Sequence, residues 1–159
     1  MNEFRVTKYD PQYRVGGAYT REEWTSFADV GRVFGGEKLT LAAYEQAEAQ
    51  HIRFLADLAA MCGAGPLRIN AYEAYDPGLP WREGQEIPPA DLPRVVRDVL
   101  RERCWCRLVG CGFFIHFGYE YYLYVGCGAE EPSVAALAAG CGLFCEAFRS
   151  PYHDEEAPR

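Results

Sequence analysis

The chain has 159 residues with a formal net charge of −7, and 49% of its residues are hydrophobic and 14% aromatic. This length fits one domain with a sizeable core, and the aromatic content excludes a disordered chain. Lysine occurs only at Lys8 and Lys38, so the sequence argues against direct nucleic-acid binding. The acidic charge is then explained either by a basic protein partner or by solubility alone.

The first third of the chain predicts a strand, a short helix and a long helix. Residues 4–8 alternate apolar and polar side chains, which is typical of a strand. Thr25 or Ser26 is expected to cap a short helix that ends at a glycine pair; its apolar residues at helical spacing are Phe27, Val30 and Phe34. Thr40 is expected to begin the longest helix, which ends near Gly63.

The middle of the chain predicts a strand, a long loop and a third helix. Residues 67–73 read as a strand, and residues 75–89 as a proline-rich loop. A helix opens at Asp91 or Pro93, with its arginines facing solvent. Its buried face is expected to comprise Leu92, Val95, Val96, Val99 and Leu100.

Residues 106–125 carry the strongest strand signal. A strand at 106–109 leads into two aromatic runs, 113–117 and 119–125, which flank Gly118 and predict a hairpin. If Gly118 and Tyr119 form its turn, residues 113, 115 and 117 share a face with Tyr122 and Tyr124; a different turn length changes this pairing.

The last elements are a short alanine-rich helix from Glu131 and a strand over 143–148. The predicted fold class is therefore α+β: a single domain over 1–152, with a mixed or antiparallel sheet of about five strands and helices packed on it. A sheet covered by helices on both faces is the alternative. Residues 153–159 are expected to form a polar C-terminal tail.

The seven cysteines are expected to be reduced. The count is odd, residues 1–6 lack the apolar stretch of a signal peptide, and no run is long enough to cross a membrane. We therefore expect a cytoplasmic protein without a membrane segment.

No catalytic or cofactor motif occurs, so we expect no cofactor and favour a protein that is not an enzyme. One cluster could hold a metal ion, or could provide a thiol nucleophile with a histidine base: Cys104, Cys106, Cys111 and His116. Its spacing matches no familiar zinc site, and no cysteine opens a helix, where the pKa of a thiol would be lowered. Buried cysteines and a hydrogen-bonded core histidine are the simpler interpretation.

An aromatic and acidic segment gives the candidate partner-binding residues. Aromatic side chains anchor interfaces, and carboxylates around them would attract a basic partner. Trp81, expected to be exposed, would be the main anchor. The alternative is a loop that folds its aromatics onto the core. The candidate residues are Tyr72, Glu73, Tyr75, Asp76, Trp81, Glu83 and Glu86.

Three segments carry a resemblance to known proteins: the opening around residues 7–26, the Gly-Tyr-Glu-Tyr-Tyr run at 118–122 and the Phe-Arg-Ser-Pro-Tyr run at 148–152. Together they are similar to small uncharacterised bacterial proteins associated with toxin immunity. Together with the acidic charge, the aromatic and acidic segment and the absence of catalytic motifs, the resemblance leads us to expect a non-enzymatic inhibitor that occludes the active site of a basic toxin domain. The resemblance assigns no site residues. The alternative is a small-molecule sensor or enzyme with a pocket beside the 113–125 hairpin, using Tyr121, His116 or a cysteine.

Overall fold

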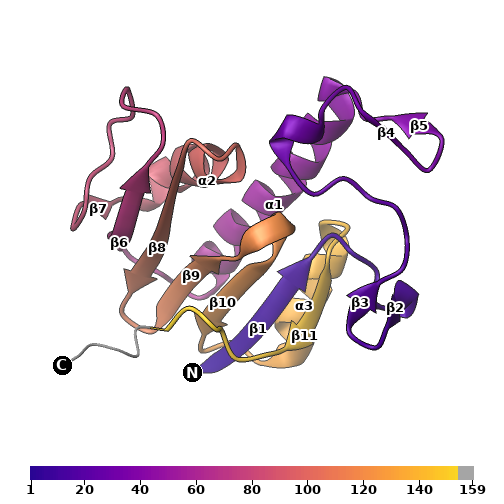
Figure 1. Cartoon of the computed structure of the whole chain (residues 1–159). Helices are drawn as coiled ribbons and strands as arrows, with labels where there is room; N and C mark the ends of the chain where they lie inside the picture. The colour runs from indigo at the N-terminus through magenta and orange to yellow at the C-terminus, as the bar shows by residue number, and fades with distance from the viewer. Residues whose placement is uncertain (154–159) are drawn as a thin grey trace.

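A seven-stranded antiparallel sheet forms the centre of the structure (Figure 1). The computed structural model describes residues 1–153. From edge to edge the strands are β11 (Phe144–Ala147), β1 (Asn2–Thr7), β10 (Leu123–Cys127), β9 (Phe113–Phe117), β8 (Cys104–Gly110), β6 (Leu67–Ala74) and β7 (Glu86–Ile87). The first strand therefore pairs with the last two strands of the chain, which joins the two ends of the sequence in one sheet.

The helices α1 (Leu41–Met61), α2 (Leu92–Leu100) and α3 (Glu131–Gly140) lie behind this sheet in Figure 1. Thr40 caps α1 as predicted, because its Oγ1 accepts a hydrogen bond of 3.1 Å from the Ala43 amide. The five residues predicted to form the inner face of α2 are all buried. The predicted α+β class is confirmed, with seven strands in the main sheet instead of about five.

Alternation along the central strands decides which side chains meet the helices. In β9 and β10, Phe113, Ile115, Phe117, Leu123 and Val125 are buried in the core cluster that the helices complete. Burying a side chain of this size contributes about 1.5–3 kcal/mol, so this inner face supplies much of the folding free energy.

The connection between β9 and β10 is longer than predicted. Leu123 pairs with Phe117, so residues 118–122 form the connection, which includes the one-turn 3-10 helix η4 (Tyr119–Tyr121). The face assignment based on a Gly118–Tyr119 turn was therefore wrong: Tyr124 lies on the outer face, opposite His116. The extra residues stand out from the sheet and form part of the candidate site.

The outer face of the sheet is crossed by residues 148–153, which we call the C-terminal strap (yellow in Figure 1). The Ser150 amide donates to Glu3 Oε1 (2.9 Å), and Ser150 Oγ lies 2.7 Å from His116 Nδ1. Arg107 donates to the Tyr152 carbonyl (2.8 Å). The first residue of the predicted polar tail, His153, is held to the sheet, because its Nε2 lies 2.9 Å from Glu3 Oε1. The rest of the predicted tail, residues 154–159, lies outside the described part of the chain.

The segment between β1 and α1 consists of turns and two small hairpins: β2 (Arg14–Val15) with β3 (Ala18–Tyr19), and β4 (Val33–Phe34) with β5 (Glu37–Lys38). The helix predicted here from Ser26 to the glycine pair was wrong. Ser26 does cap a helix, but it is only the single 3-10 turn η2 (Phe27–Asp29). Gly31 follows with φ of +100°, a conformation that ends helical geometry.

Within residues 1–153, no helix combines the length and apolar character needed to cross a membrane.

Candidate functional site

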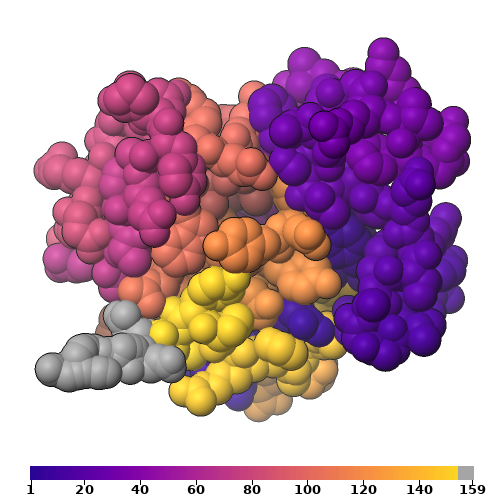
Figure 2. All heavy atoms as spheres, in the orientation of Figure 1, coloured from indigo at the N-terminus to yellow at the C-terminus, as the bar shows by residue number. Residues whose placement is uncertain are grey.

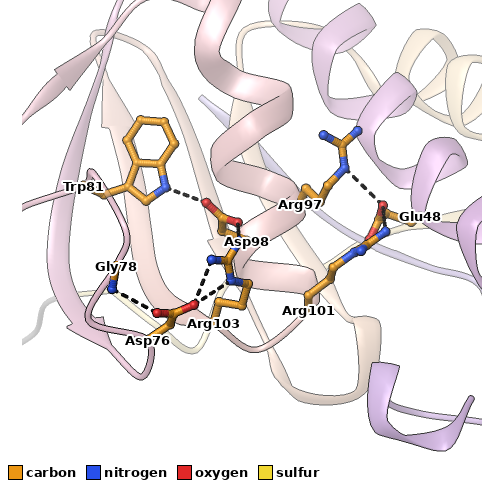
Figure 3. A network of polar contacts seen from close by, with 8 residues as sticks. All are labelled: Glu48, Asp76, Gly78, Trp81, Arg97, Asp98, Arg101 and Arg103. Atoms are coloured by element: carbon orange, nitrogen blue, oxygen red, sulfur yellow. Dashed lines mark hydrogen bonds and ion pairs between the residues drawn. The ribbon is translucent and has the colours of Figure 1, made fainter.

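The structure places Trp81 in the core, so the expectation of an exposed indole was wrong. Trp81 is only 7% exposed, and its Nε1 donates a hydrogen bond of 2.7 Å to Asp98 Oδ2 on α2 (Figure 3). A buried indole needs such a partner for its N–H group. Trp81 therefore fixes the 75–85 connection between β6 and β7 to α2 and is not available as a surface anchor.

Two of the predicted carboxylates are also used inside the protein. Asp76 accepts hydrogen bonds of 2.8 and 3.0 Å from Arg103, which also pairs with Asp98 (Figure 3). Glu83 accepts from the amides of Ala71 and Tyr72, where β6 bulges and Ala71 has φ of +55°. Both carboxylates hold the chain in its local conformation.

The remaining four predicted residues do not converge on one point. Tyr72 is half-buried against the core, while Glu73 and Glu86 are exposed. Tyr75 is 61% exposed, and its hydroxyl donates to Glu73 (3.2 Å). Of the seven predicted residues, Tyr75 is the one that lines the aromatic pocket beside the β9–β10 hairpin.

This pocket has a volume of about 430 Å³ and lies beside the β9–β10 hairpin. In Figure 2, the orange surface of this hairpin lies between the indigo N-terminal lobe and the magenta lobe that contains β6 and β7. Six of the fourteen lining residues are aromatic. The lining comprises Thr25, Tyr75, Val99, Leu100, Glu102, Cys104, Trp105, Phe117, Gly118, Tyr119, Glu120, Tyr121, Tyr122 and Leu123.

The 118–122 segment forms one wall of the pocket and is fixed by hydrogen bonds at several points. The Gly118 amide donates to the Tyr122 carbonyl (2.7 Å), and the Tyr9 hydroxyl donates to the Glu120 carbonyl (2.8 Å). Glu120 and Tyr121 have φ of 59° and 68°, a left-handed conformation that is unfavourable for residues with a Cβ atom. The segment is therefore held rigidly in a strained conformation.

A buried polar network supports this wall from below. The Tyr121 hydroxyl lies 2.8 Å from both the Leu100 carbonyl and the Tyr44 hydroxyl, and Tyr44 donates to Glu48 (2.9 Å). Glu48 also accepts from Arg97 and Arg101 (Figure 3). Burial acts to raise the pKa of Glu48, but the hydrogen bonds from Arg101 and Tyr44 outweigh it and lower that pKa. Glu48 therefore stays ionised and keeps Tyr44 and Tyr121 in place.

The cysteines and histidines do not form a reactive centre. Cys104 and Cys106 both face the core, Cys111 is exposed at the β8–β9 turn, and His116 lies on the outer face under the C-terminal strap. Burial raises the pKa of the Cys104 thiol to about 12 and also raises that of Cys106, so both thiols are neutral and weakly nucleophilic. Among residues 1–153, no group of three or more candidate ligands is arranged to hold a metal ion.

The alternative prediction placed a pocket beside the 113–125 hairpin, and of the residues named for it Tyr121 and Cys104 line the pocket whereas His116 does not. Sequence reasoning missed most of the other lining residues. The run at residues 119–122 was predicted as part of a strand, and Glu102 and Trp105 were not singled out. One signal was present: an acidic residue, Glu120, interrupts an otherwise aromatic run, which is unusual for a buried strand. The meeting of Tyr75 with Tyr119 has no local signal, because it depends on the pairing of distant strands.

Comparison with protein-family models, with curated proteins and with solved structures finds no significant match for this chain.

Proposed function

We propose that this chain is a non-enzymatic protein-binding inhibitor, specifically an immunity protein that neutralises a bacterial toxin by occluding its active site. The observation that carries the proposal is the rim of the aromatic pocket. Tyr75 and Tyr119 both line the pocket and are 61% and 82% exposed. Large aromatic side chains held at the surface on a rigid support are typical anchors of protein interfaces.

The charge of the surface supports a basic partner. The chain carries a net charge of −7, and Glu102 and Glu120 line the pocket. A toxin that acts on an anionic substrate presents Lys and Arg in its cleft, and carboxylates on the inhibitor pair with those same groups. The inhibitor would thus block the substrate site and accelerate its own association.

Co-expression with a candidate toxin, sought among the products of neighbouring genes, tests the proposal. Wild-type protein should protect the cells and form a stable complex with the purified toxin domain. The double variant Tyr75→Ser/Tyr119→Ser should fold normally and bind at least about 30-fold more weakly, a loss of about 2 kcal/mol. Leu41→Ala, which changes an exposed apolar side chain on α1, serves as the control and should bind like wild type.

Two results would overturn the proposal: absence of both protection and complex formation with wild-type protein, or a complex that the rim variant leaves at full strength.

A small-molecule sensor is the second candidate, because the pocket volume falls in the range of ligand sites, roughly 300–1,000 Å³. An enzyme is disfavoured, since the Cys104 thiol in the pocket is neutral and His116 lies on the opposite face of the sheet. Native mass spectrometry of the chain purified from its own cells tests this candidate. A retained small molecule that is lost in the pocket-filling variant Val99→Phe would favour it; a ligand-free spectrum would exclude a tightly bound ligand.

A further inference from the structure

Two carboxylates of the pocket occupy backbone positions that favour glycine. Glu102 follows the end of α2 with φ of 61°; its amide donates to the Val99 carbonyl, and the next amide donates to the Asp98 carbonyl. This is the Schellman pattern of helix ends, in which the left-handed position is usually glycine. Glu120 has φ of 59° in the 118–122 segment. Local backbone preference therefore opposes a glutamate at both positions.

The strained backbone is concentrated at this one site. Within residues 1–153, four non-glycine residues have positive φ, and three of them, Glu102, Glu120 and Tyr121, line the pocket. Each such residue costs of the order of 1 kcal/mol or more, and such strain collects at binding and catalytic sites. A ligand that uses both carboxylates gives a reason for their presence.

Within residues 1–153, neither carboxylate forms an ion pair, although Glu120 also lines a neighbouring cavity that includes Arg21. None of the pocket-lining residues is Lys, Arg or His. Glu102 accepts a hydrogen bond from the uncharged Ser26 hydroxyl (2.9 Å). The Glu120 carboxylate forms no hydrogen bond or ion pair with any side chain or backbone group of residues 1–153. The nearest arginines in sequence are paired elsewhere: Arg101 with Glu48, and Arg103 with Asp76 and Asp98.

We infer that the pocket binds an arginine side chain of the protein partner. The planar guanidinium group can stack on an aromatic ring while its N–H groups donate to carboxylates, which matches a pocket walled by Trp105 and tyrosines and edged by Glu102 and Glu120. The inference rests on the proposed function in one respect: the arginine belongs to the inhibited protein. The rigid 118–122 wall reduces the entropy lost on binding.

The test uses two matched probes, N-acetyl-arginine N-methylamide and its citrulline counterpart, which has nearly the same shape but no charge. Nuclear magnetic resonance titration of the full-length chain at low salt follows the Trp105 indole and the amides of residues 118–122. The arginine probe should shift these signals saturably, with a Kd of about 1 mM as expected for a single side chain, and the citrulline probe should bind at least tenfold more weakly.

Variants locate the site. Glu102→Gln/Glu120→Gln keeps the backbone and the side-chain volume but removes both charges, and should weaken arginine binding at least tenfold. Glu37→Gln removes an exposed carboxylate outside the pocket and should leave binding unchanged. Equal binding of both probes, arginine shifts that map elsewhere, or an unchanged Kd in the double variant would each overturn the inference.

The outcome is separable from that of the proposed function. If the arginine probe fails while toxin protection persists and depends on Tyr75 and Tyr119, the inferred ligand is wrong and the inhibitor proposal stands. If the probe binds as expected but no toxin is neutralised, the cation site stands and the inhibitor proposal fails.

Discussion

The buried indole of Trp81 links the connection between β6 and β7 to α2 through its hydrogen bond to Asp98. Trp81→Ala should therefore destabilise the protein by about 3–5 kcal/mol, because a large buried side chain is lost and a cavity remains. Trp81→Phe should cost less, since it keeps most of the packing and loses the hydrogen bond. Chemical denaturation measures both; an unchanged midpoint for the alanine variant would mean that the indole is not packed in solution.

His51 is fully buried on α1, where Nδ1 lies 2.7 Å from the Ala47 carbonyl. Burial lowers its pKa from about 6.5 to about 4. The unfolded chain therefore binds a proton at His51 more readily than the folded chain does. The stability gained from keeping His51 neutral is fully present above pH 6.5 and is lost as the pH falls toward 4.

Each pKa unit is worth about 1.4 kcal/mol, so His51 should remove roughly 2 kcal/mol of stability between pH 6.5 and pH 5. Urea denaturation at both values measures the loss, and His51→Leu is the comparison because it cannot titrate. The variant should lose about 2 kcal/mol less than wild type over this interval. Equal losses in the two proteins would show that His51 does not control this part of the pH dependence.

At the scale of secondary-structure elements, the C-terminus of α2 and the 118–122 connection both carry a glutamate in a left-handed conformation. Glu102→Gly and Glu120→Gly should each stabilise the protein by up to about 1 kcal/mol, because glycine adopts this conformation without a steric penalty. The alanine variants at the same positions keep the Cβ atom and should show no such gain. Thermal denaturation of the four variants measures the difference; glycine variants no more stable than the alanine variants would contradict the assigned strain.

The C-terminal strap is a second element whose position rests on a few polar contacts. Ser150 is buried, and its Oγ lies 2.7 Å from His116 Nδ1 and accepts a hydrogen bond from the Tyr152 amide (3.1 Å). Ser150→Ala should cost about 1–3 kcal/mol, because buried polar groups lose a partner. The neighbouring Arg149→Ala, at an exposed position, is the control and should change stability by less than about 0.5 kcal/mol. A stable Ser150→Ala protein would indicate that the strap is not docked in solution.

At the scale of the whole molecule, we expect the core of buried aromatic and aliphatic side chains to be sufficient for folding without a metal or a disulfide. Chelator and reductant should therefore leave the Tm essentially unchanged, and a shift of many degrees would point to a structural metal or cross-link.

In the native state, one thiol should react rapidly with a soluble thiol reagent. This is Cys111, which is exposed, whereas the other six cysteines are buried or half-buried.

The pocket is a property of the whole molecule as well, because its walls come from four distant parts of the chain, including Thr25 near the N-terminus. Tyr75 follows β6, Glu102 follows α2, and Tyr119 lies between β9 and β10. They meet because β6 and β9 both pair with β8 in the sheet. A site assembled in this way is sensitive to strand register, so mutations in the central strands should affect it as strongly as mutations at its rim.

The sequence by itself determined the elements whose signals are local. The cap at Thr40, the apolar face of α2 and the aromatic strands on either side of Gly118 each depend on residues a few positions apart, so periodicity and capping chemistry were sufficient. The helix after Ser26 was predicted from the helical spacing of Phe27, Val30 and Phe34. The prediction was wrong because the glycine conformations in that segment favour a turn and a hairpin.

Only the tertiary structure decided which aromatic residues are buried and which are exposed. Trp81 and Tyr75 belong to one stretch of similar composition, yet Trp81 meets Asp98 and is buried, whereas Tyr75 faces the pocket. The same holds for the carboxylates: Asp76 and Glu83 are bonded within the fold, while Glu102 and Glu120 line the pocket. Composition identifies residues able to bind a partner, but burial and pairing are set by contacts between distant segments, which no local pattern contains.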